Sequence, residues 1–304
     1  MFQGKEGCPQ FEELEVFAED TRPLVLVLHG LTGGSQEIYV QSFMRHCFEA
    51  HGWESVCFNY RGCAGTELES PRGYCASDTR DLRHVVGRIQ ARYPHRPLLA
   101  VGFSLGGMIL TKYVSEEESG CPLLCGMAVS SPLDLHASSR VLGRGFNKYV
   151  YNYRLGRNLK NLVRRNLEQY RAMESVDVDR LLKIRTIYEF DAEFVVPMYG
   201  YDNVEHYYSD ASPFTNFPLI RIPFLTLNSI DDSFAPVTHL PLQESVLENP
   251  HVAHVLTAYG GHVMYMQRAP PSQSSWGFRA ASFSFADQVG AEFFQSTLDQ
   301  KEGH

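Results

Sequence analysis

The stretch GFSLG at residues 102–106 decides the fold of this chain. An apolar run precedes it at residues 97–101, and a segment of helical character follows it at residues 107–114. This context predicts a sharp turn between a buried strand and a helix, with Ser104 exposed on it as a nucleophile. The turn requires glycines, because a Cβ at either glycine of the stretch would crowd the neighbouring strand and helix. A plain glycine-rich turn is the alternative, and the two flanks favour the nucleophile.

Short apolar runs alternate with helical patterns along most of the chain. We expect strands at residues 23–29, 55–59, 98–102, 123–130, 223–228 and 252–257, and helices at residues 36–50, 77–93, 104–114 and 286–298. Repeated strand–helix units predict a mostly parallel sheet with helices on both faces. The length suits one large α/β domain over residues 1–304.

One long stretch, residues 132–218, breaks this alternation because it contains no clear strand pattern. It is rich in arginine, asparagine and aromatic residues at mixed spacing. Ligands of open α/β sheets bind outside the carboxyl ends of the strands, where such an insertion must emerge. We therefore expect a helical cap over the strand ends; a decoration with no role at the site is the alternative.

A serine nucleophile needs a base and an acid that orients the base, in the chain order Ser, Asp, His on such a scaffold. Asp231 and Asp232 lie in the loop after the strand expected at residues 223–228, and His262 follows two glycines after the last expected strand. Both aspartates cannot point at one imidazole. We expect Asp232 to orient His262, and Asp231 to have a structural role.

Ester hydrolysis also requires N–H donors aimed at a developing oxyanion. One donor should be the backbone N–H of Leu105, and the other that of Leu31 in the glycine-rich loop at residues 29–35. Thr32 is the nearby alternative for the second donor, and a turn that binds no ligand is the alternative for the loop. His29 competes with His262 as the base, but it precedes the nucleophile in the chain, so we interpret it as structural.

The composition excludes several other classes of protein. A formal net charge of −8 argues against a nucleic-acid partner. Seven cysteines without C-x-x-C pairs predict free thiols in a reducing compartment rather than a disulfide framework or a zinc site. Residues 1–10 lack the apolar core of a secretory signal, and the sequence has no apolar run long enough to span a bilayer. We therefore expect an intracellular protein.

Together these features resemble the α/β-hydrolase superfamily, and more narrowly its YheT-like abhydrolase subgroup of animal lipases and esterases. The resemblance also rests on residues 30–33 with Tyr39, 58–62 with Gly65, 92–94, 207–213 and 228–232. It implies an α/β-hydrolase fold with a helical cap and no cofactor. It also implies a serine hydrolase that cleaves the acyl esters of phospholipids such as phosphatidylcholine, or medium-chain esters, through an acyl-serine intermediate.

The chain departs from the subgroup in three respects. Members often have an N-terminal membrane anchor, which is not seen here, and residues 263–266 and 270–272 differ from the usual pattern after the histidine. The third departure is Tyr60, which stands where an asparagine is often found. The second departure keeps open a catalytically weak binding or scaffold protein, and a small-molecule hydrolase unrelated to lipids is a further alternative.

Membrane association is expected from the resemblance, and exposed apolar surface at the pocket is a candidate for peripheral membrane contact. No segment of the sequence stands out as a strongly amphipathic helix that would support such contact. For Arg61, a structural ion pair is favoured over contact with a phosphate headgroup. The sequence does not specify an oligomeric state.

Overall fold

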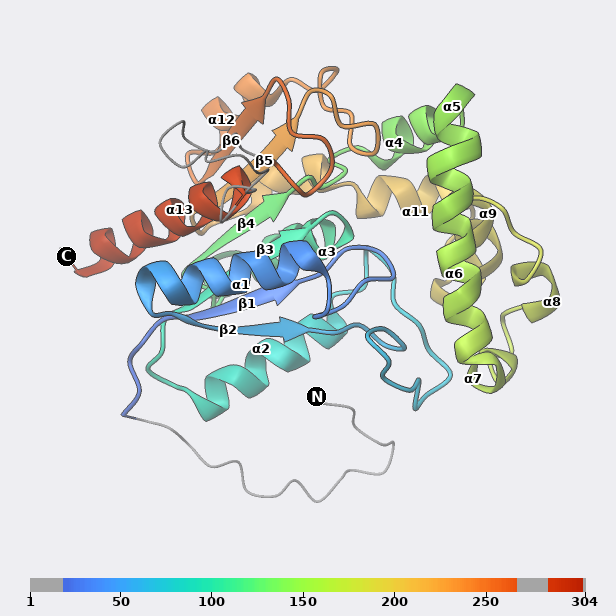
Figure 1. Ribbon diagram of the computed structural model, residues 1–304, viewed down its shortest axis with the longest axis horizontal. Coiled ribbons are helices and arrows are strands. Elements are labelled where there is room, and N and C mark those ends of the chain that lie inside the picture. Colours follow the sequence, from blue (N-terminus) through green and yellow to red (C-terminus); the bar gives the residue numbers. More distant parts are fainter. Residues whose placement is uncertain (1–18, 267–283, 303–304) are drawn as a thin grey trace, which may run out of the picture.

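The structure, a computed structural model, describes residues 19–266 and 284–302 (Figure 1). Its centre is a six-stranded sheet in the order β2-β1-β3-β4-β5-β6, in which all neighbouring strands are parallel. The strands are β1 (Leu24–Leu28), β2 (Glu54–Phe58), β3 (Leu98–Phe103), β4 (Cys125–Val129), β5 (Phe224–Ser229) and β6 (Val252–Thr257). The sheet confirms the mostly parallel α/β architecture expected from the sequence.

Helices cover both faces of this sheet (Figure 1). On one face, α1 (Ile38–His51) and α13 (Phe285–Glu302) pack against the strands, with Phe43 and Phe294 in the shared core. On the other face lie α2 (Arg80–Arg92), α3 (Leu105–Glu117) and α12 (Leu242–Glu248). A short 3₁₀ turn, η1 (Glu118–Gly120), follows α3.

Continuous apolar runs in the sequence correspond to strands that are buried on both faces. Every residue of β1, β3, β4 and β5 is buried, as expected for the middle of a parallel sheet. The observed boundaries differ from the expected ones by a few residues; for example, the strand expected at 123–130 begins at Cys125. The helix expected from residue 77 begins at Arg80, whose backbone N–H donates to the Asp78 carboxylate at 3.2 Å.

Between β4 and β5 the chain leaves the sheet and forms a helical cap. The elements of the cap are α4 (Leu135–Leu142), α5 (Gly145–Asn147), η2 (Lys148–Asn152), α6 (Tyr153–Arg165), α7 (Leu167–Arg171), α8 (Val178–Leu181), α9 (Ile187–Phe190), η3 (Asp191–Val195), α10 (Val196–Tyr199), α11 (Val204–Ala211) and η4 (Pro213–Leu219). Most of them share a hydrophobic core of their own. Figure 1 shows α6 as the long helix of the cap, with α5 at one end and α7 at the other.

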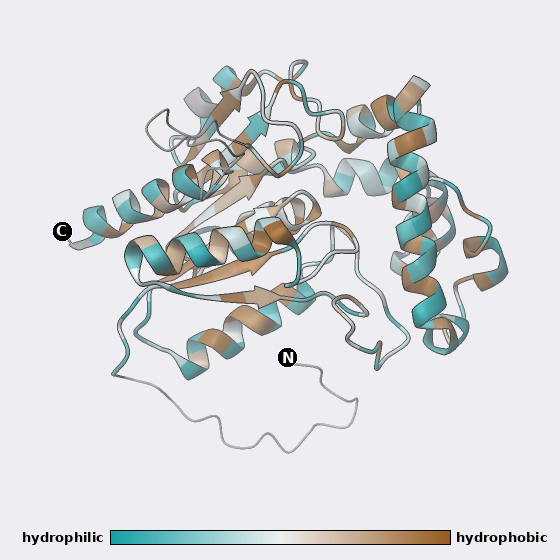
Figure 2. Cartoon of the chain, in the orientation of Figure 1, coloured by the Kyte–Doolittle hydropathy of each residue, from teal (hydrophilic) through white to brown (hydrophobic). Residues whose placement is uncertain are grey.

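The longest helix of the cap corrects one expectation from the sequence. In α6, Gly156, Leu159, Leu162 and Val163 are buried on one side. The arginines of the same helix are exposed on the other side, so hydrophobic and hydrophilic positions alternate along it in Figure 2. The expectation that the chain contains no strongly amphipathic helix is therefore wrong for α6.

The strand order places two loops at the point where the sheet's connections change direction. β1 pairs with β2 on one side and with β3 on the other, and Leu28 aligns with Gly102 of β3. The loops that follow β1 and β3 therefore emerge side by side at the carboxyl edge, which is where open α/β sheets bind ligands.

Candidate active site

Ser104 lies on a strained turn between β3 and α3. Its backbone has φ 53° and ψ −116°, a conformation that a residue with a side chain rarely adopts. The glycines of the turn make this geometry accessible. A Cβ at Gly102 would lie 2.6 Å from the backbone nitrogen of Gly107, and one at Gly106 would lie 2.8 Å from the carbonyl oxygen of His29. The crowding expected from the sequence is thus present at both positions.

The three residues expected to act together are in hydrogen-bond contact. His262 Nε2 lies 3.0 Å from Ser104 Oγ, and His262 Nδ1 lies 2.7 Å from Asp232 Oδ2. The Asp232 side chain is fully buried, and that of His262 is 20% exposed. A carboxylate facing Nδ1 selects the tautomer in which Nε2 carries no proton, so Nε2 is free to accept the serine proton.

Adjacent aspartates at the end of β5 face different partners. Asp232 Oδ1 accepts hydrogen bonds from the backbone N–H groups of Phe234 and Ala235, at 2.8 and 3.3 Å. Asp231 instead accepts from the Ser229 hydroxyl and from the N–H groups of the two glycines before His262, at 3.1 and 2.9 Å. These bonds lower the pKa of Asp231. Asp231 therefore binds the backbone of the histidine loop, while Asp232 faces the imidazole.

The segment after His262 is anchored by side chains that the sequence reasoning did not identify. Tyr265 is buried, and its hydroxyl donates to the carbonyl of Leu227 at 3.2 Å and accepts from the Ser130 hydroxyl at 3.1 Å. Ser130 Oγ in turn accepts from the N–H of Val263 at 3.2 Å. The atypical residues 263–266 thus fix the loop to β4 and β5. Residues 270–272, the other part of this departure, lie outside the described residues.

Candidate oxyanion donors lie on either side of Ser104. The loop after β1 approaches closely, since a Cβ at Gly30 would lie 3.5 Å from Ser104 Cβ. Thr32 N–H already donates to Tyr74 Oη at 3.0 Å. Within the part of the chain that the structure describes, no hydrogen-bond acceptor faces the backbone N–H of Leu31 or of Leu105. The geometry therefore favours Leu31 over Thr32.

A pocket of about 360 Å³ opens at Ser104 and extends under the cap. Its wall is mainly apolar, and it includes residues from the sheet loops, from α4 and α6, and from the region of α9. The lining includes Leu31, Ser104, Leu105, Met108, Leu135, Leu142, Leu155, Leu159, Ile187, Phe190, Val195, Phe234 and His262. Such a wall suits an apolar chain attached to a group that reacts at the serine.

One carboxyl in this wall was not anticipated. Asp191 begins the π-helical segment η3, is 6% exposed and accepts a hydrogen bond from Tyr208 Oη at 2.8 Å. Burial raises the pKa of Asp191 to about 7. Irregular π turns often occur at functional sites, but a single aspartate in an aromatic stretch gives no sequence signal of this kind.

His29, the rival base, occupies a structural position. It is fully buried, with Nδ1 2.7 Å from the carbonyl oxygen of Gly30, and Nε2 accepts from the N–H of Tyr60 at 3.2 Å. Burial lowers its pKa to about 4, so the ring stays neutral. Both ring nitrogens are engaged in the turn, which agrees with the structural role expected for His29.

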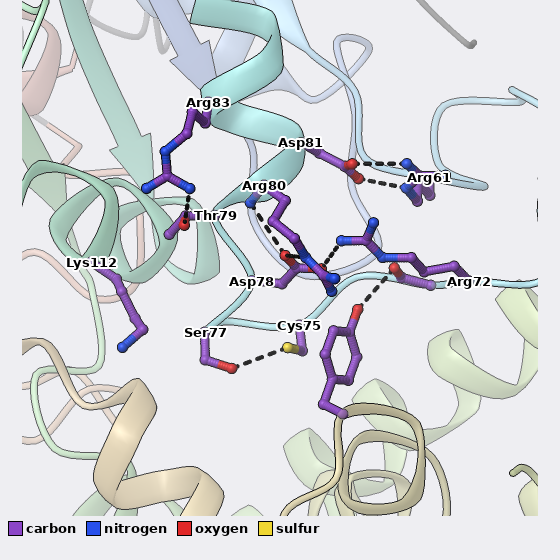
Figure 3. A network of polar contacts seen from close by, with 12 residues as sticks. Arg61, Arg72, Cys75, Ser77, Asp78, Thr79, Arg80, Asp81, Arg83 and Lys112 are labelled. Carbon is purple, nitrogen blue, oxygen red and sulfur yellow. Dashed lines mark hydrogen bonds and ion pairs between the residues drawn. The ribbon is translucent and has the colours of Figure 1, made fainter. Parts of the chain in front are cut away.

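Arg61 forms an ion pair rather than lining the pocket (Figure 3). Its guanidinium donates twice to Asp81, at 2.5 and 2.8 Å, and once to Ser70 at 2.8 Å. The contact with Asp81 raises the pKa of Arg61. The structural interpretation of Arg61 therefore agrees with the structure.

Neither a metal centre nor a membrane-spanning helix is found in the described residues. Among residues 19–266 and 284–302, no three histidine, cysteine or acidic side chains gather as ligands of a metal ion. Within the same ranges, every helix is too short or too polar to traverse a bilayer.

The chain is similar to several curated proteins. Human phospholipase ABHD3 is 38% identical over 284 residues, which cover 93% of this chain and 66% of the relative. The monoacylglycerol lipase of Saccharomyces cerevisiae is 36% identical over 252 residues, covering 81% of this chain and 55% of the relative. The chain thus spans about two thirds or less of these curated relatives.

Solved structures show the same fold. The esterase Pf2001 of Pyrococcus furiosus superposes with a TM-score of 0.54 and 17% identity, covering 91% of this chain and 83% of the esterase. Residues 23–269 also match the family model described as the alpha/beta hydrolase fold. The chain therefore belongs to the α/β-hydrolase fold family, as the resemblance in its sequence indicated.

Proposed function

We propose that this protein is a serine hydrolase of carboxylic esters. The observation that carries the proposal is the continuous contact from Ser104 Oγ through His262 to the buried Asp232 carboxylate, at the mouth of an apolar pocket. The serine turn and the two N–H groups beside it supply the remaining parts of an acyl-transfer site. The names of the relatives, a phospholipase and a monoacylglycerol lipase, support the same class of reaction.

The reaction would proceed through an acyl-serine. Ser104 Oγ attacks the ester carbonyl carbon while His262 Nε2 takes its proton, and the N–H groups of Leu31 and Leu105 bind the oxyanion. The protonated imidazole, stabilised by Asp232, then gives this proton to the leaving alcohol oxygen as the carbon–oxygen bond breaks. Water attacks the acyl-serine with His262 again as base, which releases the acid and restores Ser104.

The thiol in the same pocket is a weaker nucleophile. Cys75 lines the pocket, but burial raises the pKa of its thiol to about 12, so it carries no thiolate near neutral pH. Ser104, by contrast, has a base in hydrogen-bond contact. This contrast supports Ser104 as the acyl acceptor.

We further infer a lipid ester as the substrate, with the acyl chain under the cap and the alcohol portion toward the opening. The apolar wall and the relatives' names support acyl chains of phospholipids or medium-chain esters. We also infer that the chain folds as one domain, with residues 132–218 as the cap, and that it acts in contact with a membrane.

The test is a chain-length series of p-nitrophenyl esters, followed by phosphatidylcholines of matched acyl length, with the parent protein and Ser104→Ala. We expect turnover that rises with chain length to a medium-chain maximum and is lost in Ser104→Ala. A flat series, or turnover retained in Ser104→Ala, would contradict the proposal.

A further inference from the structure

A basic segment lies in the cap of this otherwise acidic chain. Residues 135–167 contain eight lysines and arginines and no aspartate or glutamate. These are Arg140, Arg144, Lys148, Arg154, Arg157, Lys160, Arg164 and Arg165. Because the whole chain has a formal net charge of −8, the remainder of the sequence carries −16. Positive charge is therefore concentrated in residues 135–167 of the cap.

These cations are directed to solvent. All of them are exposed except Lys160, which is partly buried. Within the described residues, none of the eight forms an ion pair with a carboxylate. The contrast with Arg61, Arg72 and Arg80, which are paired with aspartates in Figure 3, is clear. The segment is a surface of unneutralised positive charge.

Exposed apolar side chains lie among these cations. Phe146, Tyr149 and Tyr153 are 68%, 74% and 51% exposed, and Val150 and Tyr151 are 42% and 36% exposed. All five belong to α5, η2 and the first residue of α6, which form one end of the long cap helix in Figure 1. We call residues 144–154 the cap tip. Large exposed apolar groups gathered in this way mark a contact surface.

The cap tip is connected to the pocket opening through aromatic contacts. The Phe146 ring lies 5.8 Å from that of Tyr151, which lies 4.9 Å from that of Phe234. Phe234 in turn stacks on the His262 imidazole at 4.6 Å. Phe234 and His262 both line the pocket. A surface that binds the cap tip therefore lies next to the entrance of the pocket.

We propose that the cap tip docks on a lipid surface that contains anionic headgroups. Tyrosine and phenylalanine insert at the headgroup level, while arginine and lysine stay among the phosphates, so this combination fits a bilayer interface. The acidic remainder of the molecule is repelled by the same surface, which orients the cap tip, and with it the pocket opening, toward the lipid. The proposed docking does not depend on the proposed function, but a role of the docking in delivering substrate does.

The test measures binding of the full chain carrying Ser104→Ala, which leaves the vesicles intact. Co-sedimentation uses vesicles of phosphatidylcholine alone and of phosphatidylcholine with roughly 30% phosphatidylserine, an anionic lipid of the cytoplasmic leaflet. We expect strong, salt-sensitive binding to the anionic vesicles and weak binding to the neutral ones.

Charge and aromatic variants separate the cap tip from the rest of the surface. The triple change Arg144→Ala, Lys148→Ala and Arg154→Ala should weaken binding roughly 100-fold, since each cation near the surface contributes about fivefold. The double change Phe146→Ser and Tyr149→Ser should also weaken it, with less dependence on salt.

The matched control removes the same charge elsewhere, with Arg171→Ala, Lys183→Ala and Lys301→Ala, which are all exposed. We expect this triple variant to bind within about threefold of the parent, because the charges lie outside the cap tip. Equal weakening by both triple variants would overturn the proposal, as would binding to a single-stranded oligonucleotide without binding to vesicles.

Turnover of a water-soluble ester keeps the two proposals apart. We expect it to be unchanged in the cap-tip triple variant, because none of these residues lines the pocket. If the parent bound anionic vesicles but hydrolysed no ester, the proposed function would fail and the docking would stand. If it hydrolysed the soluble ester but the cap-tip variant bound vesicles as well as the parent, only the docking would fail.

Discussion

Replacing Asp232 with asparagine tests the assignment of the acid in the site. Asp232 Oδ1 accepts from two backbone N–H groups, and Oδ2 faces His262 Nδ1 at 2.7 Å. In Asp232→Asn the amide oxygen is held by the two backbone donors, so the amide N–H₂ must face Nδ1. The imidazole is then forced into the tautomer with its proton on Nε2, which faces Ser104 and can no longer accept the serine proton.

The expected loss is large because the base is disabled rather than merely displaced. We expect kcat to fall by about 10⁴-fold, which corresponds to about 5 kcal/mol of transition-state stabilisation. The Michaelis constant should change little, since Asp232 does not line the pocket. The assay is steady-state hydrolysis of a medium-chain p-nitrophenyl ester, with thermal unfolding as the measure of folding.

Asp231→Asn is the matched control at the neighbouring position. Its carboxylate holds the loop through Ser229 and the N–H groups of Gly260 and Gly261, and an amide oxygen can accept the same bonds. We expect kcat within about tenfold of the parent. A larger loss in Asp231→Asn than in Asp232→Asn, or a folded Asp232→Asn that retains a tenth of the activity, would contradict the assignment of Asp232 as the acid that orients His262.

Three further changes test other parts of the structure. Gly106→Ala should lower the free energy of unfolding by at least about 3 kcal/mol in urea titrations, because its Cβ would meet rigid backbone; an unchanged midpoint would contradict this. Burial raises the pKa of Asp191 from 3.8 to about 7, so the folded state retains a proton that the unfolded state has released, and stability falls as pH rises between these values. Asp191→Asn should remove that fall: its free energy of unfolding should exceed that of the parent by up to about 4 kcal/mol above pH 7 and by little near pH 4. Equal increases at both pH values, measured by thermal unfolding, would contradict this prediction. Tyr74→Phe removes the acceptor of the Thr32 N–H, which lies in the same loop as Leu31. We expect kcat to fall about tenfold, and an unaltered kcat would show that this loop does not contribute to catalysis.

The sheet and the serine turn could be predicted from the sequence because local rules determine them. Buried parallel strands are continuous apolar runs, and the Gly102 position is crowded by the backbone of Gly106 and Gly107 in the same turn. The ends of the strands could be predicted less accurately, because a backbone hydrogen bond to a neighbouring strand, and not the residue type, determines where each strand ends.

Other features of the site depend on contacts between distant segments. Tyr265 and Ser130, which support the histidine loop, are 135 residues apart in the chain, and neither local sequence predicts the hydrogen bond between them. The burial of Asp191 likewise depends on how the cap packs. The charges of residues 135–167 could be counted in the sequence, but the sequence could not show that no carboxylate among the described residues pairs with them.

The most direct test of the central claim is labelling with a fluorophosphonate, which reacts with a serine hydroxyl that has an activating base. The parent protein and Ser104→Ala are labelled side by side and the modified peptide is identified by mass spectrometry. We expect a single modification, on Ser104, and none in Ser104→Ala. An unlabelled parent that is folded, or a label that persists in Ser104→Ala, would contradict it.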